Sequence, residues 1–141
     1  MTIVVDANVA LKWLLTEPGT SAALALLSGG EPLVAPAIVH LEVAGGLVRA
    51  TRDQRVSGTK ALSLLDDWNR MLSDGVLVLV PNEQFFDRAF RIGIEVRHTL
   101  IDCLYVAVAE SLDATLVTAD EPMHERCRSV HSRIELLSRA A

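Results

Sequence analysis

The run "TIVVD" (residues 2–6) decides the fold class of this chain. Apolar, mostly β-branched residues end in an acid, which is the pattern of a short strand buried on both faces. Similar apolar runs recur at 33–35, 76–80, 114–118 and 133–137, and longer stretches separate them. Continuous apolar strands alternating with helices predict an α/β fold whose parallel sheet is covered on both faces.

The stretches between these strands carry apolar residues at three- and four-residue spacing, which predicts helices. The predicted helices cover residues 8–15, 21–28, 37–50, 57–73, 83–95, 99–112 and 121–128. Pro36 stands where it would open the helix over 37–50. In that helix, apolar residues surround Glu42 on nearly every side, which predicts a buried helix.

Length and composition limit the class of protein. The chain has 141 residues, of which half are hydrophobic and 22% are charged. This suits one domain over residues 1–141 with a real core, and it excludes a disordered chain. No apolar run reaches the roughly 18 residues of a membrane span, and no basic segment precedes the first apolar run. Because the two cysteines lack metal-ligand spacing, we expect a reduced, cytoplasmic protein.

Four acids fall where a parallel sheet would gather them. Asp6 ends the first strand, and Asp120 follows the fourth strand. Glu42 lies in the helix after the second strand, and Asp102 lies in the first turn of "TLIDCLYVAVAE" (99–110). Ligands collect at the carboxyl ends of parallel strands, so we expect these four carboxylates at one edge of the sheet.

Such a cluster predicts a metal site. Like charges held together raise one another's pKa unless a cation neutralises them. Carboxylate oxygens suit hard ions, which here means one or two Mg²⁺ or Mn²⁺ ions. The chemistry that this site offers is attack on a phosphodiester by metal-activated water.

Three of the acids also have a structural explanation. Asp6 and Asp120 stand where they would cap the helices that follow them. Thr99 and Asp102 form a T-x-x-D variant of the capping box. Either reading of these three residues is compatible with the sequence.

Glu42 is harder to explain as a structural residue. An unpaired buried carboxylate costs several kcal/mol, so Glu42 needs an arginine, a lysine or a metal. Arg49 lies about 10 Å away along the helix, too far for an easy ion pair. Gly45 and Gly46 stand inside the same helix and indicate close approach by another backbone or by a ligand, with tight helix packing the favoured explanation.

Four segments, taken in order, resemble the PIN-domain ribonucleases, in particular the VapC-type toxins of bacterial toxin–antitoxin pairs. They are "VVDANV" (4–9), "HLEVAGGLVRA" (40–50), "TLIDCLYVAVAE" (99–110) and "LVTAD" (116–120), and they run across the whole chain. The resemblance implies a three-layer α/β/α sandwich around a mainly parallel sheet. That expectation agrees with the alternation of strands and helices.

In that family the acids of these segments form a metal-binding active site. The residues carried over to this chain are Asp6, Glu42, Asp102 and Asp120, with Asn8 and Thr118 as supporting polar positions. The resemblance implies a metal-dependent endoribonuclease in which Asp6 and Asp102 are the primary metal ligands. Gly45 departs from the family, whose members often carry Asn there. The resemblance also implies a homodimer and a separate small antitoxin that blocks the site.

The net charge of −5 argues by itself against a nucleic-acid partner. Four of the 18 acids belong to the predicted site, however, and bound cations would offset them. Arg49, Arg52 and Arg55 form a candidate phosphate track for RNA. Arg88 and Arg91 form a second one. The four histidines share no metal spacing and are expected in packing or at the surface.

Other classes of protein remain as alternatives. A catalytically silent PIN-like module would bind RNA or protein without cutting it, and the loss of one acid would favour it, but none is lost. A phosphate-transfer domain also has an acid at the end of its first strand, but it needs a second acid nearby and a late lysine. The only lysines are Lys12 and Lys60. A nuclease that processes RNA without an antitoxin is a further possibility.

Overall fold

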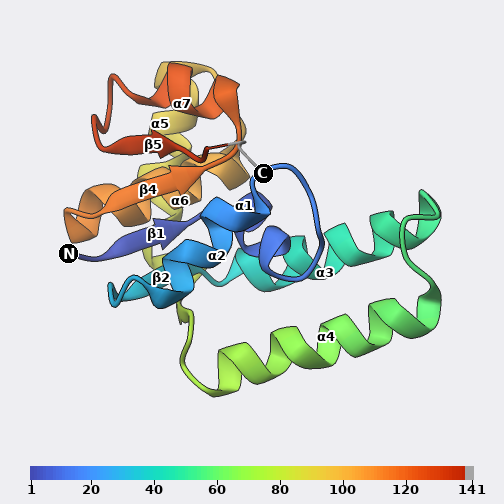
Figure 1. The fold of residues 1–141 in the computed structure, drawn as a ribbon. Coiled ribbons are helices and arrows are strands. Elements are labelled where there is room, and N and C mark those ends of the chain that lie inside the picture. Colours follow the sequence, from blue (N-terminus) through green and yellow to red (C-terminus); the bar gives the residue numbers. More distant parts are fainter. Residues whose placement is uncertain (139–141) are drawn as a thin grey trace.

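The computed structural model describes residues 1–138 and contains a five-stranded sheet (Figure 1). The strands are β1 (Ile3–Val5), β2 (Leu33–Pro36), β3 (Val78–Val80), β4 (Thr115–Thr118) and β5 (Ile134–Leu136). Their order is β3-β2-β1-β4-β5, and all neighbouring strands are parallel. The predicted α/β class and parallel sheet are confirmed. The predicted domain covers residues 1–141, and its last three residues lie outside the described ones.

Four helices and a 3₁₀ turn come from the first half of the chain. They are α1 (Ala7–Ala10), η1 (Leu11–Trp13), α2 (Thr20–Ser28), α3 (Ile38–Arg52) and α4 (Gly58–Ser73). The single helix predicted over 8–15 is wrong, because α1 tightens into η1 after one turn. The tighter turn brings Trp13 to α2, where its indole N–H donates to the Ala23 carbonyl at 2.8 Å.

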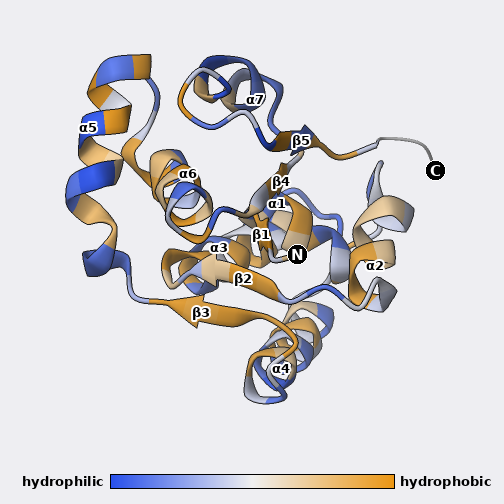
Figure 2. Ribbon diagram, turned by 90° about the vertical axis from the view of Figure 1, so that its left-hand side faces the viewer, coloured by the Kyte–Doolittle hydropathy of each residue, from blue (hydrophilic) through white to orange (hydrophobic). Residues whose placement is uncertain are grey.

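The second half of the chain supplies the other covering layer. Its helices are α5 (Phe86–Val96), α6 (Leu100–Leu112) and α7 (Glu121–Cys127), and the 3₁₀ turn η2 (Asn82–Gln84) precedes α5. Helix α6 contacts β1, β2 and β4, and all residues from Cys103 to Ala109 are buried. Figure 2 shows α5 and α6 on one side of the sheet and α2 on the opposite side. The expected three-layer arrangement is confirmed.

Side-chain caps set the starting points of two helices near the sheet edge. Thr99 Oγ1 accepts the N–H of Asp102 at 3.3 Å and begins α6. Asp120 Oδ1 accepts the N–H of Met123 at 3.2 Å and begins α7. Each cap satisfies a backbone donor that the first helical turn leaves unpaired. These caps fix Asp102 and Asp120 at the starts of their helices.

Two predictions about α3 are wrong. Pro36 does not open this helix but ends β2, where a residue without an N–H does not break the ladder. Helix α3 begins at Ile38, whose N–H donates to Asn82 Oδ1 at 2.9 Å. Nor is α3 buried on all sides, since Leu41 is 69% exposed. The reason is that α3 and α4 pack against each other and project beyond the sheet (Figure 1).

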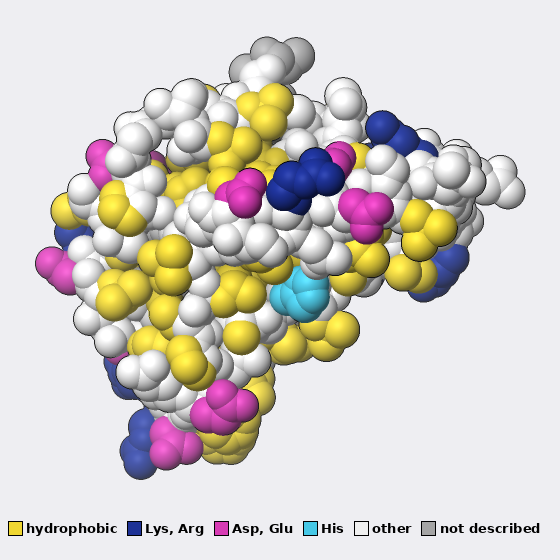
Figure 3. Space-filling view, turned by 90° about the horizontal axis from the view of Figure 1, so that it is seen from below, with side chains coloured by type: hydrophobic (Ala, Val, Ile, Leu, Met, Phe, Trp, Pro, Cys, Tyr) yellow, Lys and Arg dark blue, Asp and Glu magenta, His cyan; other side chains and the backbone are white. Residues whose placement is uncertain are grey.

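Apolar side chains are numerous on the face of the molecule where α4 lies (Figure 3). Leu62 of α4, Val78 of β3 and Leu41 of α3 are among the exposed apolar side chains. Along residues 1–138, no helix has both the length and the hydropathy to cross a bilayer.

Candidate active site

Asp6 occupies the centre of the candidate site. It directly follows β1, the middle strand of the sheet, and its side chain is 3% exposed. Its carboxylate accepts the Thr118 hydroxyl, with 2.7 Å between Oδ2 and Oγ1. The Asp6 side chain forms no capping hydrogen bond to α1, although it precedes that helix. The capping explanation for Asp6 is therefore wrong, and its burial needs another reason.

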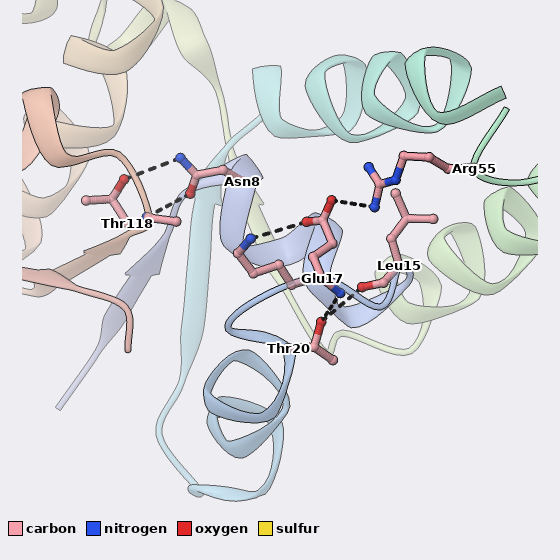
Figure 4. A network of polar contacts seen from close by, with 8 residues as sticks. Asn8, Leu15, Glu17, Thr20, Arg55 and Thr118 are labelled. Carbon is pink, nitrogen blue, oxygen red and sulfur yellow. Dashed lines mark hydrogen bonds and ion pairs between the residues drawn. The ribbon is translucent and has the colours of Figure 1, made fainter. Parts of the chain in front are cut away.

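Thr118 and Asn8 form the polar support beneath Asp6. The Thr118 hydroxyl donates to Asp6 and accepts the N–H of Asp120 at 3.0 Å. It also lies 3.5 Å from Asn8 Nδ2 (Figure 4). Asn8 Oδ1 accepts the N–H of Ala119 at 3.0 Å. A hydroxyl has one proton and two lone pairs, so Thr118 uses all its positions. Its orientation, and with it that of Asp6, is fixed by these contacts.

The electrostatics of Asp6 indicate a crowded anionic site. Burial raises the pKa of Asp6 from 3.8 to about 7, and the hydrogen bond from Thr118 partly opposes this rise. The negative charges of Asp102 and Glu42 raise the pKa further. The structure therefore brings three of the four predicted acids within electrostatic reach of one another.

Glu42 is half-buried on α3 and is held from α6. Its Oε1 accepts the phenolic hydroxyl of Tyr105 at 2.6 Å. Burial raises the pKa of Glu42, the Tyr105 hydrogen bond opposes the rise, and the charge of Asp102 adds to it. The prediction that Glu42 must have an arginine, lysine or metal partner overlooked this neutral partner. Tyr105 follows Asp102 by three residues on one helix face, but its partner Glu42 lies 63 positions away, so no local spacing predicts their contact.

Asp102 has a partner that the sequence analysis assigned to packing or surface. His98 Nε2 lies 2.6 Å from Asp102 Oδ2, and Arg126 lies 3.3 Å from the other ring nitrogen, Nδ1. A guanidinium only donates, so Nδ1 accepts and Nε2 carries the proton that is donated to Asp102. The side chain of His98 is packed in the interior, as expected, but its hydrogen bond to Asp102 was not predicted. The signal was its position four residues before an acid at a helix start.

Asp120 acts both as a cap and as a neighbour of Asp102. Its Oδ1 caps α7, as one of the two readings predicted. One potential ligand atom from each of His98, Asp102 and Asp120 lies within 4.8 Å of the other two. A carboxylate has two oxygens, so capping with one leaves the other available. Asp102 thus belongs both to this group and to the group with Asp6 and Glu42.

The side chains present fit a divalent cation. Along residues 1–138, no lysine or arginine forms an ion pair with any of the four acids. Clustered carboxylates without such a partner are destabilised unless they take up protons or bind a cation. Oxygen ligands of this kind suit Mg²⁺ or Mn²⁺. His98 is oriented toward Asp102 as a donor, so we treat it as a positioning residue.

One arginine of each predicted phosphate track forms an ion pair with a glutamate. Arg55 is directed at Glu17, with an ion pair of 3.0 Å, and Lys12 shares the same carboxylate at 3.2 Å (Figure 4). Arg88 forms a two-point pair with Glu110, with both contacts at 2.7 Å. The two other arginines of the first track, both on α3, make no such contact with residues 1–138.

Comparison with known proteins places the chain in a family. The model of the PIN domain matches residues 3–129. VapC ribonuclease Mb0985 of Mycobacterium bovis and Ribonuclease VapC12 of Mycobacterium tuberculosis are each 33% identical over 118 residues. Each match covers 84% of this chain, with 85% and 86% of the two relatives. The chain belongs to the PIN-domain family. Its relatives there are VapC ribonucleases, as the four segments implied.

Solved structures share the fold at lower identity. VapBC2 from Rickettsia felis, bound to a DNA fragment from its promoter, has a TM-score of 0.64 at 15% identity, over 96% of this chain and 98% of that one. VapC20 of Mycobacterium tuberculosis, a toxin that cleaves the sarcin–ricin loop, has a TM-score of 0.63 at 15% identity. That match covers 86% of this chain and 92% of VapC20. These likenesses support the same three-layer fold.

Proposed function

We propose that this chain is a cytoplasmic, metal-dependent endoribonuclease of the VapC type, the toxin of a toxin–antitoxin pair. One observation carries the proposal. Asp6, Glu42 and Asp102 lie within electrostatic reach of one another, and burial together with mutual repulsion raises the pKa of Asp6 to about 7 without a basic partner. The names of the relatives, which are ribonucleases, support the same reaction.

The four acids have distinct tasks in this proposal. Asp6 and Asp102 hold one Mg²⁺ or Mn²⁺ ion. Glu42 and Asp120 complete the cluster, orient the attacking water or hold a second ion. A bound ion polarises the scissile phosphate and lowers the pKa of bound water. Glu42 has a raised pKa, which suits a group that accepts the proton of the attacking water.

The surrounding side chains keep these acids in place. Thr118 and Asn8 fix Asp6 from the end of β4 and from α1. Tyr105 holds Glu42, and His98 holds Asp102. An acid whose side chain already accepts a hydrogen bond from a neighbour loses less conformational freedom when it binds an ion. Attack by water with departure of the 3′ oxygen leaves a 5′-phosphate and a 3′-hydroxyl.

Exposed apolar surface supports the proposed partners, an antitoxin and a second copy of this chain. A groove of about 350 Å³ between α3 and α4 is lined mainly by apolar side chains, among them Leu47, Val48, Leu62 and Leu65. We propose that an apolar segment of the antitoxin occupies this groove. Solved toxin–antitoxin complexes are among the structures with this fold, which supports a partner of that kind.

Cleavage of a mixed tRNA and ribosomal RNA pool tests the proposed reaction. The purified chain is incubated with Mg²⁺ or Mn²⁺, or with EDTA, next to the variants Asp102→Asn and Asp66→Asn. We expect metal-dependent cutting that Asp102→Asn abolishes. Asp66 is an exposed acid of α4, so its variant serves as the matched control and keeps full activity.

Mn²⁺ binding is measured on the same samples by calorimetry. Full cleavage by Asp102→Asn would contradict the site assignment. A native chain that neither binds Mn²⁺ nor cuts RNA would favour the silent binding module instead.

A further inference from the structure

The two glycines inside α3 stand in different surroundings. A Cβ added to Gly46 would lie 2.6 Å from Leu11 Cδ2, closer than side chains tolerate. A side chain at Gly46 would therefore have to displace Leu11, so Gly46 allows the close packing of α3 on η1. A Cβ added to Gly45 would meet no atom within 4 Å. The packing explanation favoured from the sequence thus accounts for Gly46 but not for Gly45, which faces open space.

That open space is a pocket beside the proposed cleavage site. It has a volume of about 360 Å³, and its lining includes Asn8, Glu42, Gly45, Arg49 and Arg52. The four α3 residues follow one another at three- and four-residue spacing, so they share one face of the helix. Helical side chains lean toward the N-terminus, which directs both arginines back toward Glu42.

The charges of this pocket are unpaired. Arg49 and Arg52 are exposed, and neither guanidinium group has a hydrogen bond or ion pair with any residue from 1 to 138. Arg49 does not neutralise Glu42, whose hydrogen bond comes from Tyr105. Cations at the end of a helix are stabilised by its dipole, but that effect requires no pocket. Two unpaired guanidinium groups beside a hollow are suited to an anion, and phosphate is the anion that they bind in two-point geometry.

We propose that this pocket binds the nucleotide next to the scissile phosphate of a single-stranded RNA, with Arg49 and Arg52 holding its phosphate. Gly45 admits this nucleotide because it places no side chain in the pocket. The proposal rests on the proposed function, since Glu42 lies both in the pocket and in the cleavage site. The volume is near the lower end of the range of about 300–1,000 Å³ for small-ligand sites, which suits one nucleotide and not a folded RNA.

Binding of a short fluorescein-labelled single-stranded RNA of mixed sequence tests the pocket. Fluorescence anisotropy is measured in EDTA, where no cleavage interferes, at several salt concentrations. Arg49→Ala and Arg52→Ala should each weaken binding roughly tenfold, as expected for hydrogen bonds between charged groups. Each should lower the slope of log K against log salt by about 0.7, the value for one phosphate on a single strand.

Two further variants sharpen the experiment. Gly45→Leu fills the pocket and should weaken RNA binding without lowering thermal stability. Arg70→Ala removes an exposed arginine of α4 and serves as the matched control, with unchanged affinity and salt slope. Unchanged RNA binding in Gly45→Leu and in both α3 arginine variants would overturn the pocket. If these variants weaken binding of an acidic peptide but leave RNA binding unchanged, the pocket belongs to a protein partner. That result would also overturn the proposal.

Cleavage assays with Mn²⁺ separate this proposal from the proposed function. If the native chain cuts RNA and the pocket variants bind RNA normally, the nuclease stands and the pocket fails. If the pocket variants weaken RNA binding in EDTA but the native chain cuts nothing, the pocket stands and the nuclease fails.

Discussion

The surroundings of Asp6 raise the pKa of its carboxyl group into the neutral range, and this raised pKa affects the stability of the fold. Its pKa of about 7 in the folded chain lies above the ordinary value of 3.8. Between these values the folded state binds more protons than the unfolded state. The metal-free protein should therefore lose stability as pH rises from about 4 to about 7. Glu42, whose pKa is also raised by burial, acts in the same direction.

Thermal unfolding in EDTA over this pH range measures the effect. Asp6→Asn removes the buried charge, so this variant should melt at a higher temperature than the native chain at about pH 8, with a smaller difference at about pH 5. Mn²⁺ should raise the melting temperature of the native chain at about pH 8 but leave the variant unaffected. Identical pH profiles for the two proteins would rule out Asp6 as the cause.

His98 is a residue whose effect passes through another side chain. Its Nε2 donates to Asp102, so His98→Ala should lower Mn²⁺ affinity about tenfold to a hundredfold, the usual effect of losing the partner of a metal ligand. His98→Gln retains an N–H donor and should recover part of that loss. Calorimetric titration with Mn²⁺ measures both, with His124→Ala on α7 as the control. Equal losses in the Ala and Gln variants would contradict a hydrogen-bonding role.

Among the helices, α3 carries two adjacent glycines with different roles. Gly46 packs against Leu11, and Gly45 lines the pocket proposed for RNA. Gly45→Ala should stabilise the chain by about 1 kcal/mol, since alanine is the better helix former and its Cβ meets no atom. Gly46→Ala should instead destabilise it by roughly 1–3 kcal/mol, because the added Cβ overlaps Leu11. Urea unfolding of the two variants measures the difference. Equal shifts in the same direction would contradict the asymmetry of the pair.

At the scale of the whole molecule, α5 presents a surface suited to a second copy of this chain. Phe86, Phe90 and Ile94 are 47%, 52% and 67% exposed, and the two rings lie 6.5 Å apart. Asp87 and Arg91 line the same surface. In a two-fold dimer with antiparallel α5 helices, Asp87 of one protomer would lie opposite Arg91 of the partner subunit, so the face is self-complementary.

Light scattering tests this dimer. Phe90→Glu places a charge in the centre of the face and should convert a dimer into a monomer while the unfolding temperature is retained. Leu24→Glu alters an exposed apolar residue of α2 and should leave the mass unchanged. A native chain that is monomeric at all concentrations would contradict the dimer.

The parts of the fold and site that were predictable depend on local pattern. Apolar runs such as "TIVVD" identify buried strands, because a strand covered on both faces must be apolar at successive positions. A parallel arrangement brings the carboxyl ends of the strands to one edge of the sheet. The acids that follow the strands are therefore predicted there, with Asp6 near Asp102. The four segments, taken in order, were sufficient to predict membership of the PIN-domain family.

The hydrogen-bond partners of those acids depend on tertiary contacts. Glu42 and Tyr105 are 63 positions apart, and Thr118 and Asp6 are 112 apart, so no local pattern connects them. The structure likewise pairs Arg55 with Glu17, and it shows that Gly46 packs against Leu11 while Gly45 faces open space. The strands, their parallel sheet and the edge at which the acids are expected follow from local sequence pattern. Side-chain partners follow from long-range packing, because hydrogen bonds depend on contact distances that only the folded chain defines.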